Sequence, residues 1–209
     1  MKPISPTWTR DKLAPLPREY YARPTLEVAQ DLLGKYLTRV IDGEQLRGII
    51  VEVEAYIGED DPACHARFGL TNRNRVMYCE GGFSYVYFVY GMYNMLNVVT
   101  EKSAFPAAVL IRALEPVSGL EKMRELRGKD RVADLTNGPG KLCDALGIDT
   151  SLSGIDLTSN QLYISNGDVG EFNIASSGRI GIKEGTERQW RFFIEGNRFV
   201  SKWDSENRE

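Results

Sequence analysis

Residues 36–55 read YLTRVIDGEQLRGIIVEVEA, and they contain the clearest strand–turn–strand pattern in the chain. Two apolar runs, 36–41 and 46–55, flank the pair Asp42-Gly43, which favours a two-residue turn between paired strands. The second run alternates apolar and charged residues with the period of a β-strand. The segment therefore predicts an antiparallel β-hairpin.

Other elements are predicted on both sides of this hairpin. Residues 24–33 begin with proline and are followed by Gly34, a pattern typical of a helix and its C-terminal stop. Helices are also expected at 118–127 and 141–146, and strands at 83–90, 94–99, 107–113, 161–165, 179–183 and 190–195. Hairpins that precede interspersed helices favour an α/β mixed (α+β) fold, with a mixed, mainly antiparallel sheet and surrounding helices. We expect an extended N-terminal arm at 1–17, a single compact domain at 18–203 and a charged tail at 204–209.

Composition limits the class of protein. The chain has 209 residues, of which 42% are hydrophobic and 26% charged, as in ordinary globular proteins. No run approaches the ~20 apolar residues of a membrane span, and the first residues lack the apolar segment of a secretory signal. The three cysteines form no CxxC pair, and there is one histidine. We therefore expect no metal site, no disulfide framework, no membrane contact and a reducing cytoplasm as the compartment.

The net charge of −3 is unevenly distributed. Residues 144–171 carry five acidic and no basic side chains, so removing them leaves the rest of the chain at +2. Basic residues recur in the first 23 positions, between 67 and 75, and from 122 to 131. A positive face that meets a polyanion is compatible with this distribution, as is an ordinary solvated surface.

A cluster of tyrosines occupies residues 78–97, which read YCEGGFSYVYFVYGMYNMLN. Tyr85 and Tyr87 share one face of the predicted strand, whereas Tyr90 lies at its end, just before Gly91. Phenols this close together are costly to bury unless each hydroxyl has a partner. The cluster fits either a half-buried strand or a surface that receives flat, partly polar rings, such as nucleic-acid bases.

Two glutamates follow one another on one face of the second hairpin strand. Glu52 and Glu54 lie opposite the apolar face of that strand, which favours their exposure to solvent. Alternatively, Glu54 ends its strand at a pocket near Tyr56, where partial desolvation would make it a useful base toward water. The sequence leaves both interpretations open.

Three further polar residues lie where chemistry is possible. His65 is either a hydrogen-bonded structural residue or part of a site shared with Glu54. Asn97 and Arg112 lie on predicted strands that are otherwise apolar. Arg112 either reaches the sheet edge or pairs with a carboxylate such as Glu54, because a buried arginine needs a charged partner.

Taken together, these segments resemble the alkyladenine-type family of 3-methyladenine DNA glycosylases. The resemblance covers about residues 18–201, in this order: RPTLEVAQDLLGKYL, GIIVEVEAYIGEDDPACHARFG, NRNRVMY, YVYFVYGMYNMLNVV, AAVLIRALEP, LTNGPGKLCDALGI, RIGI and FVS. It implies a compact single domain and a monofunctional enzyme of base excision repair. Such an enzyme hydrolyses the N-glycosidic bond of damaged purines, such as 3-methyladenine, 7-methylguanine or hypoxanthine, without a metal or cofactor. The implied partner is double-stranded DNA that contains these bases, bound by a monomer in the cytoplasm, at the nucleoid in a prokaryote.

The resemblance also implies roles for the residues that do the chemistry. Glu54, in EAY, matches the general base that activates the attacking water. Arg112, in RALEP, matches the arginine that helps to hold this water and its base. The main-chain carbonyl near Val200 is expected to complete the water site.

Four residues match the pocket that holds the extruded base. Tyr56 and Tyr87 match its aromatic walls, and His65 matches a hydrogen-bonding residue. Asn97 matches the side chain that crowds the exocyclic amino group of normal guanine. No lysine falls in this matched set, which implies hydrolysis without strand cleavage.

Three residues match the part of the family that enters the duplex. Tyr90 matches the side chain that fills the gap left by the flipped base, and Met92 and Tyr93 follow it along the groove. The chain departs from the family at Asn72, where relatives often carry proline, and its N-terminal arm lacks the extension of larger members.

Two other classes of function remain open. A module that recognises distorted duplexes without catalysis would need the tyrosines but not Glu54 beside Arg112. A hydrolase of free nucleosides would have no use for an intercalating residue at Tyr90. These residues therefore distinguish the three hypotheses.

Overall fold

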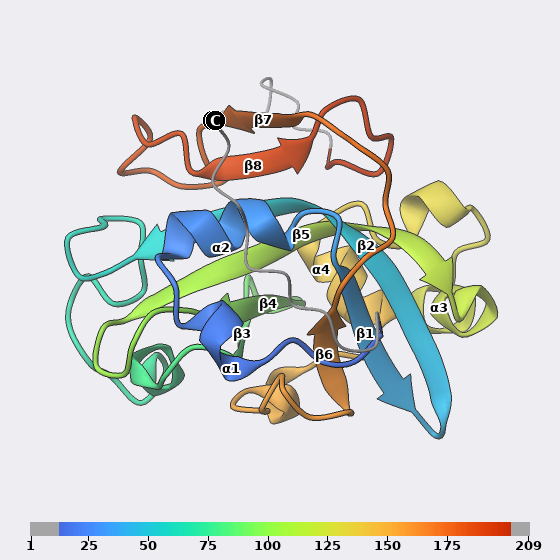
Figure 1. Cartoon of the computed structure of the whole chain (residues 1–209), viewed down its shortest axis with the longest axis horizontal. Helices are drawn as coiled ribbons and strands as arrows, with labels where there is room; N and C mark the ends of the chain where they lie inside the picture. The colour runs from blue at the N-terminus through green and yellow to red at the C-terminus, as the bar shows by residue number, and fades with distance from the viewer. Residues whose placement is uncertain (1–12, 202–209) are drawn as a thin grey trace.

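The computed structural model describes residues 13–201 and contains the predicted hairpin (Figure 1). Strand β1 (Tyr36–Ile41) pairs antiparallel with β2 (Glu44–Ile57). The turn residues Asp42 and Gly43 have positive φ angles of 51° and 84°. A turn with two such residues has the twist that antiparallel neighbours require, so Asp42-Gly43 sets the register of this pair.

The long strand β2 organises the sheet. Its first half pairs with β1 and its second half with β8 (Arg191–Ile194), while β5 (Ala107–Ser118) runs along its other edge. The order is β3-β4-β5-β2-β1-β6, with β7 paired to β8. The remaining strands are β3 (Ser84–Val89), β4 (Tyr93–Val99), β6 (Leu162–Ser165) and β7 (Ile174–Ser177).

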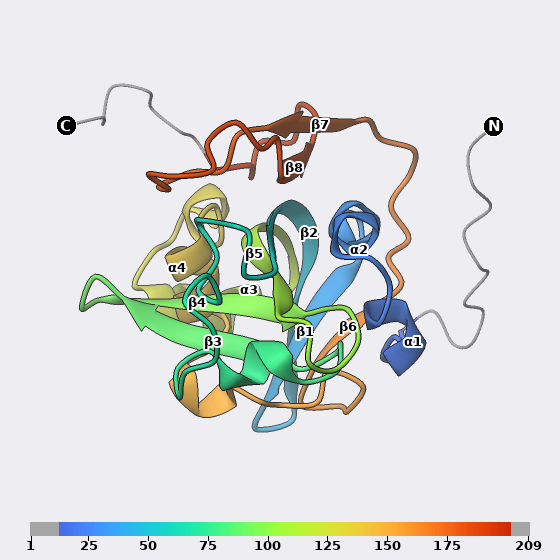
Figure 2. The ribbon, with the colours of Figure 1, turned by 90° about the vertical axis from the view of Figure 1, so that its left-hand side faces the viewer.

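Helices cover both sides of the β2–β5 pair. Figure 2 shows α2 and α4 on opposite sides of these strands, with β7 and β8 at the top of the view, where β8 continues the sheet from the edge of β2. Residue Gly34, with φ of 81°, ends α2 as predicted. The helices are α1 (Arg18–Tyr21), α2 (Thr25–Leu32), α3 (Leu120–Arg127) and α4 (Pro139–Ala145), and the 3-10 turns are η1 (Arg75–Tyr78), η2 (Val132–Asp134) and η3 (Thr150–Leu152).

The architecture confirms the predicted single compact α+β domain. Each strand pair formed within residues 13–201 is antiparallel, so the sheet has no parallel pair in this part of the chain. No helix in that range is long and apolar enough to cross a membrane. The hydrophobic core lies between the helices and the sheet, and a smaller cluster that includes Cys64, Met77 and Tyr85 lies beneath the site described below.

Two predictions concern segments at the edges of the domain. Residues 1–12 of the predicted arm and the predicted tail at 204–209 lie outside the described residues. Where the arm is described, it lies on the body, because Pro15 bridges Ser165 and the Leu16 N–H donates to the Ile164 carbonyl at 2.7 Å. The boundaries at 17 and 203 stay predictions.

The strand predicted at 179–183 is wrong. Strand β7 ends at Ser177, and the chain then forms a loop up to β8. Arg179 forms a buried ion pair with Asp61, and the Ile180 N–H donates to the side chain of Glu54 at 2.7 Å. The Ile180 N–H, which would pair with a neighbouring strand, instead donates to Glu54, and the side chain of Arg179 is held by Asp61.

Candidate active site

A cavity of about 320 Å³ lies where β2 to β5 meet the loops before α4 and after β7. This volume is at the lower end of the range of small-molecule sites. Its wall contains aromatic rings and a few polar groups. Six of the nine residues expected to form the site line it, namely Tyr56, His65, Tyr87, Tyr90, Asn97 and Arg112.

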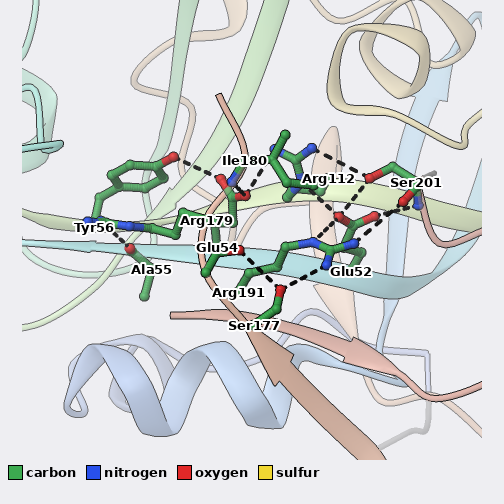
Figure 3. A network of polar contacts seen from close by, with 11 residues as sticks. Glu52, Glu54, Ala55, Tyr56, Arg112, Ser177, Arg179, Ile180, Arg191 and Ser201 are labelled. Carbon is green, nitrogen blue, oxygen red and sulfur yellow. Dashed lines mark hydrogen bonds and ion pairs between the residues drawn. The ribbon is translucent and has the colours of Figure 1, made fainter. Parts of the chain in front are cut away.

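Glu54 is buried just behind this wall (Figure 3). Its Oε2 accepts a hydrogen bond from the Tyr56 hydroxyl at 2.8 Å, and its Oε1 accepts one from the Ile180 N–H at 2.7 Å. The Arg112 Nη1 lies 3.2 Å from the same Oε1. The two donors and the arginine all line the cavity, so the carboxylate is held at its edge.

The expectation that Glu52 and Glu54 face solvent is wrong, since both side chains have no exposed surface. The loop after β7 and residue Ser201 reach this face of β2, where the Ile180 N–H donates to Glu54 and Ser201 donates to Glu52. Alternation along the strand does place the two glutamates on one face, but the strands next to β2 supply cations, Arg112 from β5 and Arg191 from β8. Burial therefore becomes possible through pairing with Arg112 and Arg191.

Arg112 lies between the two carboxylates and does not reach the sheet edge. Its Nε donates to Glu52 Oε1 at 2.8 Å, while its Nη1 faces Glu54. Burial alone would lower the pKa of Arg112, but the neighbouring Glu54 and Glu52 outweigh burial and raise this pKa above its usual range. The guanidinium is therefore a permanent cation in the cavity wall.

His65 and two tyrosines form an aromatic cluster on the other side of the cavity. The Tyr85 hydroxyl and His65 Nδ1 are hydrogen-bonded at 2.8 Å, and the His65 and Tyr87 rings meet edge to face with centroids 4.4 Å apart. Although His65 is exposed, desolvation by its neighbours and the charge of Arg73 lower its pKa to about 4. Burial raises the pKa of Tyr85 to about 12. A neutral imidazole and a protonated phenol thus share this hydrogen bond at neutral pH.

Asn97 presents a fixed amide to the cavity. Its Nδ2 donates to the Tyr85 carbonyl at 3.1 Å and to the Met95 carbonyl at 3.3 Å. The side chain is buried, so these bonds satisfy both amide hydrogens and leave Oδ1 as the remaining polar atom. The residue therefore has little freedom to adapt to a bound ring.

Tyr90 lies at the tip of the β3–β4 hairpin, which projects beyond the body on the left of Figure 2. Tyr90 is 74% exposed and has a φ of 54°, a left-handed conformation that is unusual for a residue with a side chain. Met92 and Tyr93 follow it but do not line the cavity. The ring of Tyr93 packs on Gly140, where an added Cβ would lie 2.6 Å from it.

Sequence reasoning missed the residues that hold these groups in place. Glu52 was considered only as a solvent-facing residue, and Asp61, Arg179, Arg191 and Ser201 were not singled out at all. Asp61 and Arg179 form a buried bidentate pair, with Nη2 to Oδ1 at 2.7 Å. The sequence signal for this network was the spacing of Glu52 and Glu54. The arginines that bond Glu52 lie more than 50 residues away along the chain, so no local pattern includes them.

The described part of the chain also bears on metal binding. Among residues 13–201, no group of three or more His, Cys, Asp or Glu side chains is arranged to hold a metal ion.

Comparison with known proteins places the chain in a family. The family model described as methylpurine-DNA glycosylase matches residues 19–198. A protein of Methanocella arvoryzae is 51% identical over 192 residues, which are 90% of this chain and 96% of the relative. Relatives from Salinibacter ruber and Carboxydothermus hydrogenoformans are 46% and 49% identical, over 90% of this chain and 97% and 98% of their own lengths. All three carry names that describe a 3-methyladenine DNA glycosylase. The chain therefore belongs to the methylpurine-DNA glycosylase family and is a DNA glycosylase, an enzyme that hydrolyses an N-glycosidic bond.

Proposed function

We propose that this glycosylase flips damaged purines out of duplex DNA and hydrolyses their glycosidic bond with a water molecule activated by Glu54. The observation that carries the proposal is the position of Glu54. Its buried carboxylate is held by Tyr56, Ile180 and Arg112, all of which line an aromatic cavity. A module that only binds nucleic acid would not need a carboxylate paired with an arginine at that place.

The aromatic cavity suits a flipped purine. Extrusion of a nucleotide from the duplex costs a few kcal/mol, and stacking on aromatic side chains returns about 1–3 kcal/mol per base. Tyr56 and Tyr87 both line the cavity and are proposed to stack on the base. Stacking tolerates different purines, which supports a range that includes 3-methyladenine, 7-methylguanine and hypoxanthine. Within that range, a cationic alkylated purine leaves more readily than a neutral one.

Glu54 is proposed to act as general base in the reaction. The bond between the sugar C1′ and the purine nitrogen breaks, and its electron pair leaves with the base. Water adds to C1′ and gives its proton to Glu54, whose negative charge also stabilises the oxocarbenium-like transition state. A carboxylate offers about four lone-pair positions, and Glu54 accepts two hydrogen bonds, from Tyr56 and Ile180, beside its ion pair with Arg112, so it retains acceptor capacity for the water.

Other residues are proposed to select the base and hold the DNA. The neutral His65 can hydrogen-bond a purine edge, and the fixed amide of Asn97 crowds the exocyclic amino group of guanine. Tyr90 would fill the gap in the duplex, with Met92 and Tyr93 beside it in the groove. One lesion needs only one protein molecule, so we expect a monomer that starts base excision repair at the nucleoid, in the cytoplasm.

The test is to incubate methylated duplex DNA with the parental protein and with the Glu54→Gln variant, and to quantify the free 3-methyladenine and 7-methylguanine. We expect release by the parent and none above background by the variant, while both bind the duplex. Release by both proteins would mean that another group activates the water. Binding without release by the parent would instead support a reader of distorted DNA.

Two controls make this result specific. Glu125→Gln makes the same chemical change on the exposed side of α3, where Glu125 pairs with Lys122, and should release bases at the parental rate. Free methylated nucleosides should not be hydrolysed, because they give Tyr90 no duplex to enter. Turnover of these nucleosides would favour a small-molecule hydrolase.

A further inference from the structure

A second glutamate, Glu52, is the centre of the buried polar network in Figure 3. Its Oε1 accepts from Arg112 Nε at 2.8 Å, Arg191 Nε at 2.7 Å and the Ser201 hydroxyl at 2.7 Å. Its Oε2 accepts from the Ser201 N–H at 2.6 Å. One side chain thus joins β2, β5, β8 and the segment after β8.

The local backbone helps to aim this side chain. The register of β2 against β5 shifts on both sides of Glu52, and such irregularities redirect the side chains next to them. Burial alone would raise the pKa of Glu52, but the charges of Arg112 and Arg191 and the hydrogen bonds from Ser201 and Arg191 lower it below its usual range. The group is therefore an anion without any solvent contact.

Charge neutrality in the network depends on Glu52. Two carboxylates, Glu52 and Glu54, are buried with two guanidinium groups, Arg112 and Arg191. Without Glu52, Glu54 would be the only carboxylate of the network beside two buried cations. Because uncompensated buried charges are costly, the side chains around Glu54 would have to rearrange.

The hydrogen bond from Arg112 Nε fixes the plane of its guanidinium group. With Nε held by Glu52, Nη1 is directed at Glu54, and Nη2 lies 3.5 Å from the Ser201 hydroxyl. Arg112 lines the cavity, whereas Glu52 does not. The contact with Arg112 is therefore a route by which Glu52 can act on a bound base.

We infer that Glu52 is a positioning residue for base release, which holds Arg112 in the orientation that Glu54 and the attacking water require. It also fixes the position of Ser201, which donates two hydrogen bonds to it. This inference rests on the proposed function of Glu54. It adds that the reaction depends on a glutamate that touches neither the base nor the water.

A double-mutant cycle between Glu52 and Arg112 tests the inference. Glu52→Gln, Arg112→Lys and the double variant are compared with the parent for single-turnover release of 7-methylguanine, with rates normalised to the concentration of active sites. A displacement of a catalytic group by about 1 Å can cost roughly 10²-fold in rate, so we expect Glu52→Gln to lose about 10- to 100-fold. Lysine has no Nε–H in this position, so Glu52→Gln should add at most about threefold in the Arg112→Lys background. Full additivity of the two losses would overturn the inference.

The pH–rate profile separates positioning from a structural role. Glu52 is a buried negative charge at the site, and a negative neighbour disfavours the ionised form of a carboxylate, so the acidic midpoint of the profile should move to lower pH when this charge is lost. The substrate base 7-methylguanine is already cationic, so its protonation does not shape the acidic side of the profile. That side of the profile therefore reports on the enzyme. Glu52→Asp, which keeps the charge, should retain the parental midpoint while the rate falls. An unchanged midpoint in Glu52→Gln, with a parental rate per active site, would contradict the proposal.

The same variants distinguish failure of this inference from failure of the proposed function. A parental protein that releases no base would contradict the function. In that case the free energies of unfolding of the same variants, measured in urea, would still report whether Glu52 holds Arg112. Additive losses in the double variant would show that the two residues act independently and would refute the inference. Should Glu52→Gln not fold, Glu52→Asp in the same cycle gives the same decision.

Discussion

The buried network around Glu54 and the tip of the β3–β4 hairpin are built in opposite ways. In the network, Glu52 and Glu54 have no exposed surface and are held by arginines from other strands. At the tip, Tyr90 is 74% and Met92 61% exposed, and few contacts restrain them. Both regions border the same cavity, since Arg112 lines it from one side and Tyr90 from the other.

The difference indicates that the two regions have different roles, chemistry in the buried network and DNA contact at the hairpin tip. Groups that do chemistry have to be held close to one geometry, which buried and mutually hydrogen-bonded side chains provide. A group that enters DNA has to leave water for the duplex, so it must be exposed in the free protein. Large exposed apolar side chains at one place are typical of a binding surface. Stability and DNA contact should therefore respond to different substitutions.

The largest effect on stability is expected at the buried pair of Asp61 and Arg179. Asp61→Asn leaves the guanidinium buried without its anion, so we expect a loss of about 3–5 kcal/mol in the free energy of unfolding. Urea unfolding measures this loss. The matched control is Glu184→Gln, which breaks the exposed pair with Arg67 and should cost at most about 1 kcal/mol. Equal losses in the two variants would contradict the comparison.

The same pair predicts how stability depends on pH. Burial would raise the pKa of Asp61, but Arg179 and the N–H groups of Ala63 and Ile57 lower it. A carboxyl whose pKa is lower in the folded state contributes stability above its unfolded value of about 4, and this stability is lost as the pH falls through the folded value. The parent should therefore lose stability below about pH 4 more steeply than Asp61→Asn.

A smaller effect, on activity and not on stability, is expected at Tyr90. Tyr90→Ala should lower base release by about 5- to 150-fold, which corresponds to the ~1–3 kcal/mol of an aromatic stacking contact. The urea midpoint should stay unchanged because the side chain is exposed. Tyr90→Phe keeps the ring and should retain most of the activity. A parental rate in Tyr90→Ala would remove the intercalation role.

The backbone of the tip gives a still smaller effect. Because Tyr90 has a φ of 54°, a side chain at this position is strained, and glycine would relieve the strain. Tyr90→Gly should therefore be more stable than Tyr90→Ala by about 0.5–1 kcal/mol. A less stable glycine variant would show that the tip does not hold this conformation in solution.

The last prediction concerns His65, whose pKa can be measured at the residue itself. As the chain has one histidine, its imidazole signals can be followed by NMR without assignment, and the pKa should be about 4. The unfolded state then takes up a proton between about pH 6.5 and 4, so stability should fall as the pH falls through this window. A measured pKa near 6.5 would place the ring in water instead of against Tyr85 and Tyr87.

Much of the fold could be predicted from local signals. Asp42-Gly43 specified the first hairpin and Gly34 the end of α2, since each acts through its own backbone geometry, whereas α4 begins at Pro139, two residues before the predicted helix. The false strand at 179–183 shows the limit. Its apolar alternation is compatible with a strand, but Arg179 is held by Asp61, more than 100 residues earlier in the chain.

The site was only partly predictable for the same reason. Six residues that match the family pattern line the cavity, whereas Met92 and Tyr93, which match it too, do not. Glu52 was visible in the sequence, but its burial depends on Arg112, Arg191 and Ser201, which reach it from distant segments. Local alternation indicates which face a side chain occupies but not what covers that face.

The decisive measurement is the single-turnover rate of 7-methylguanine release by Glu54→Gln at saturating enzyme, together with its affinity for the same duplex. If Glu54 activates the water, the rate should fall by about 10²- to 10⁴-fold, the usual contribution of a general base, with an unchanged Kd. A loss of only about threefold would be far smaller than the contribution of a general base, and it would contradict the assignment of the chemistry to the buried network.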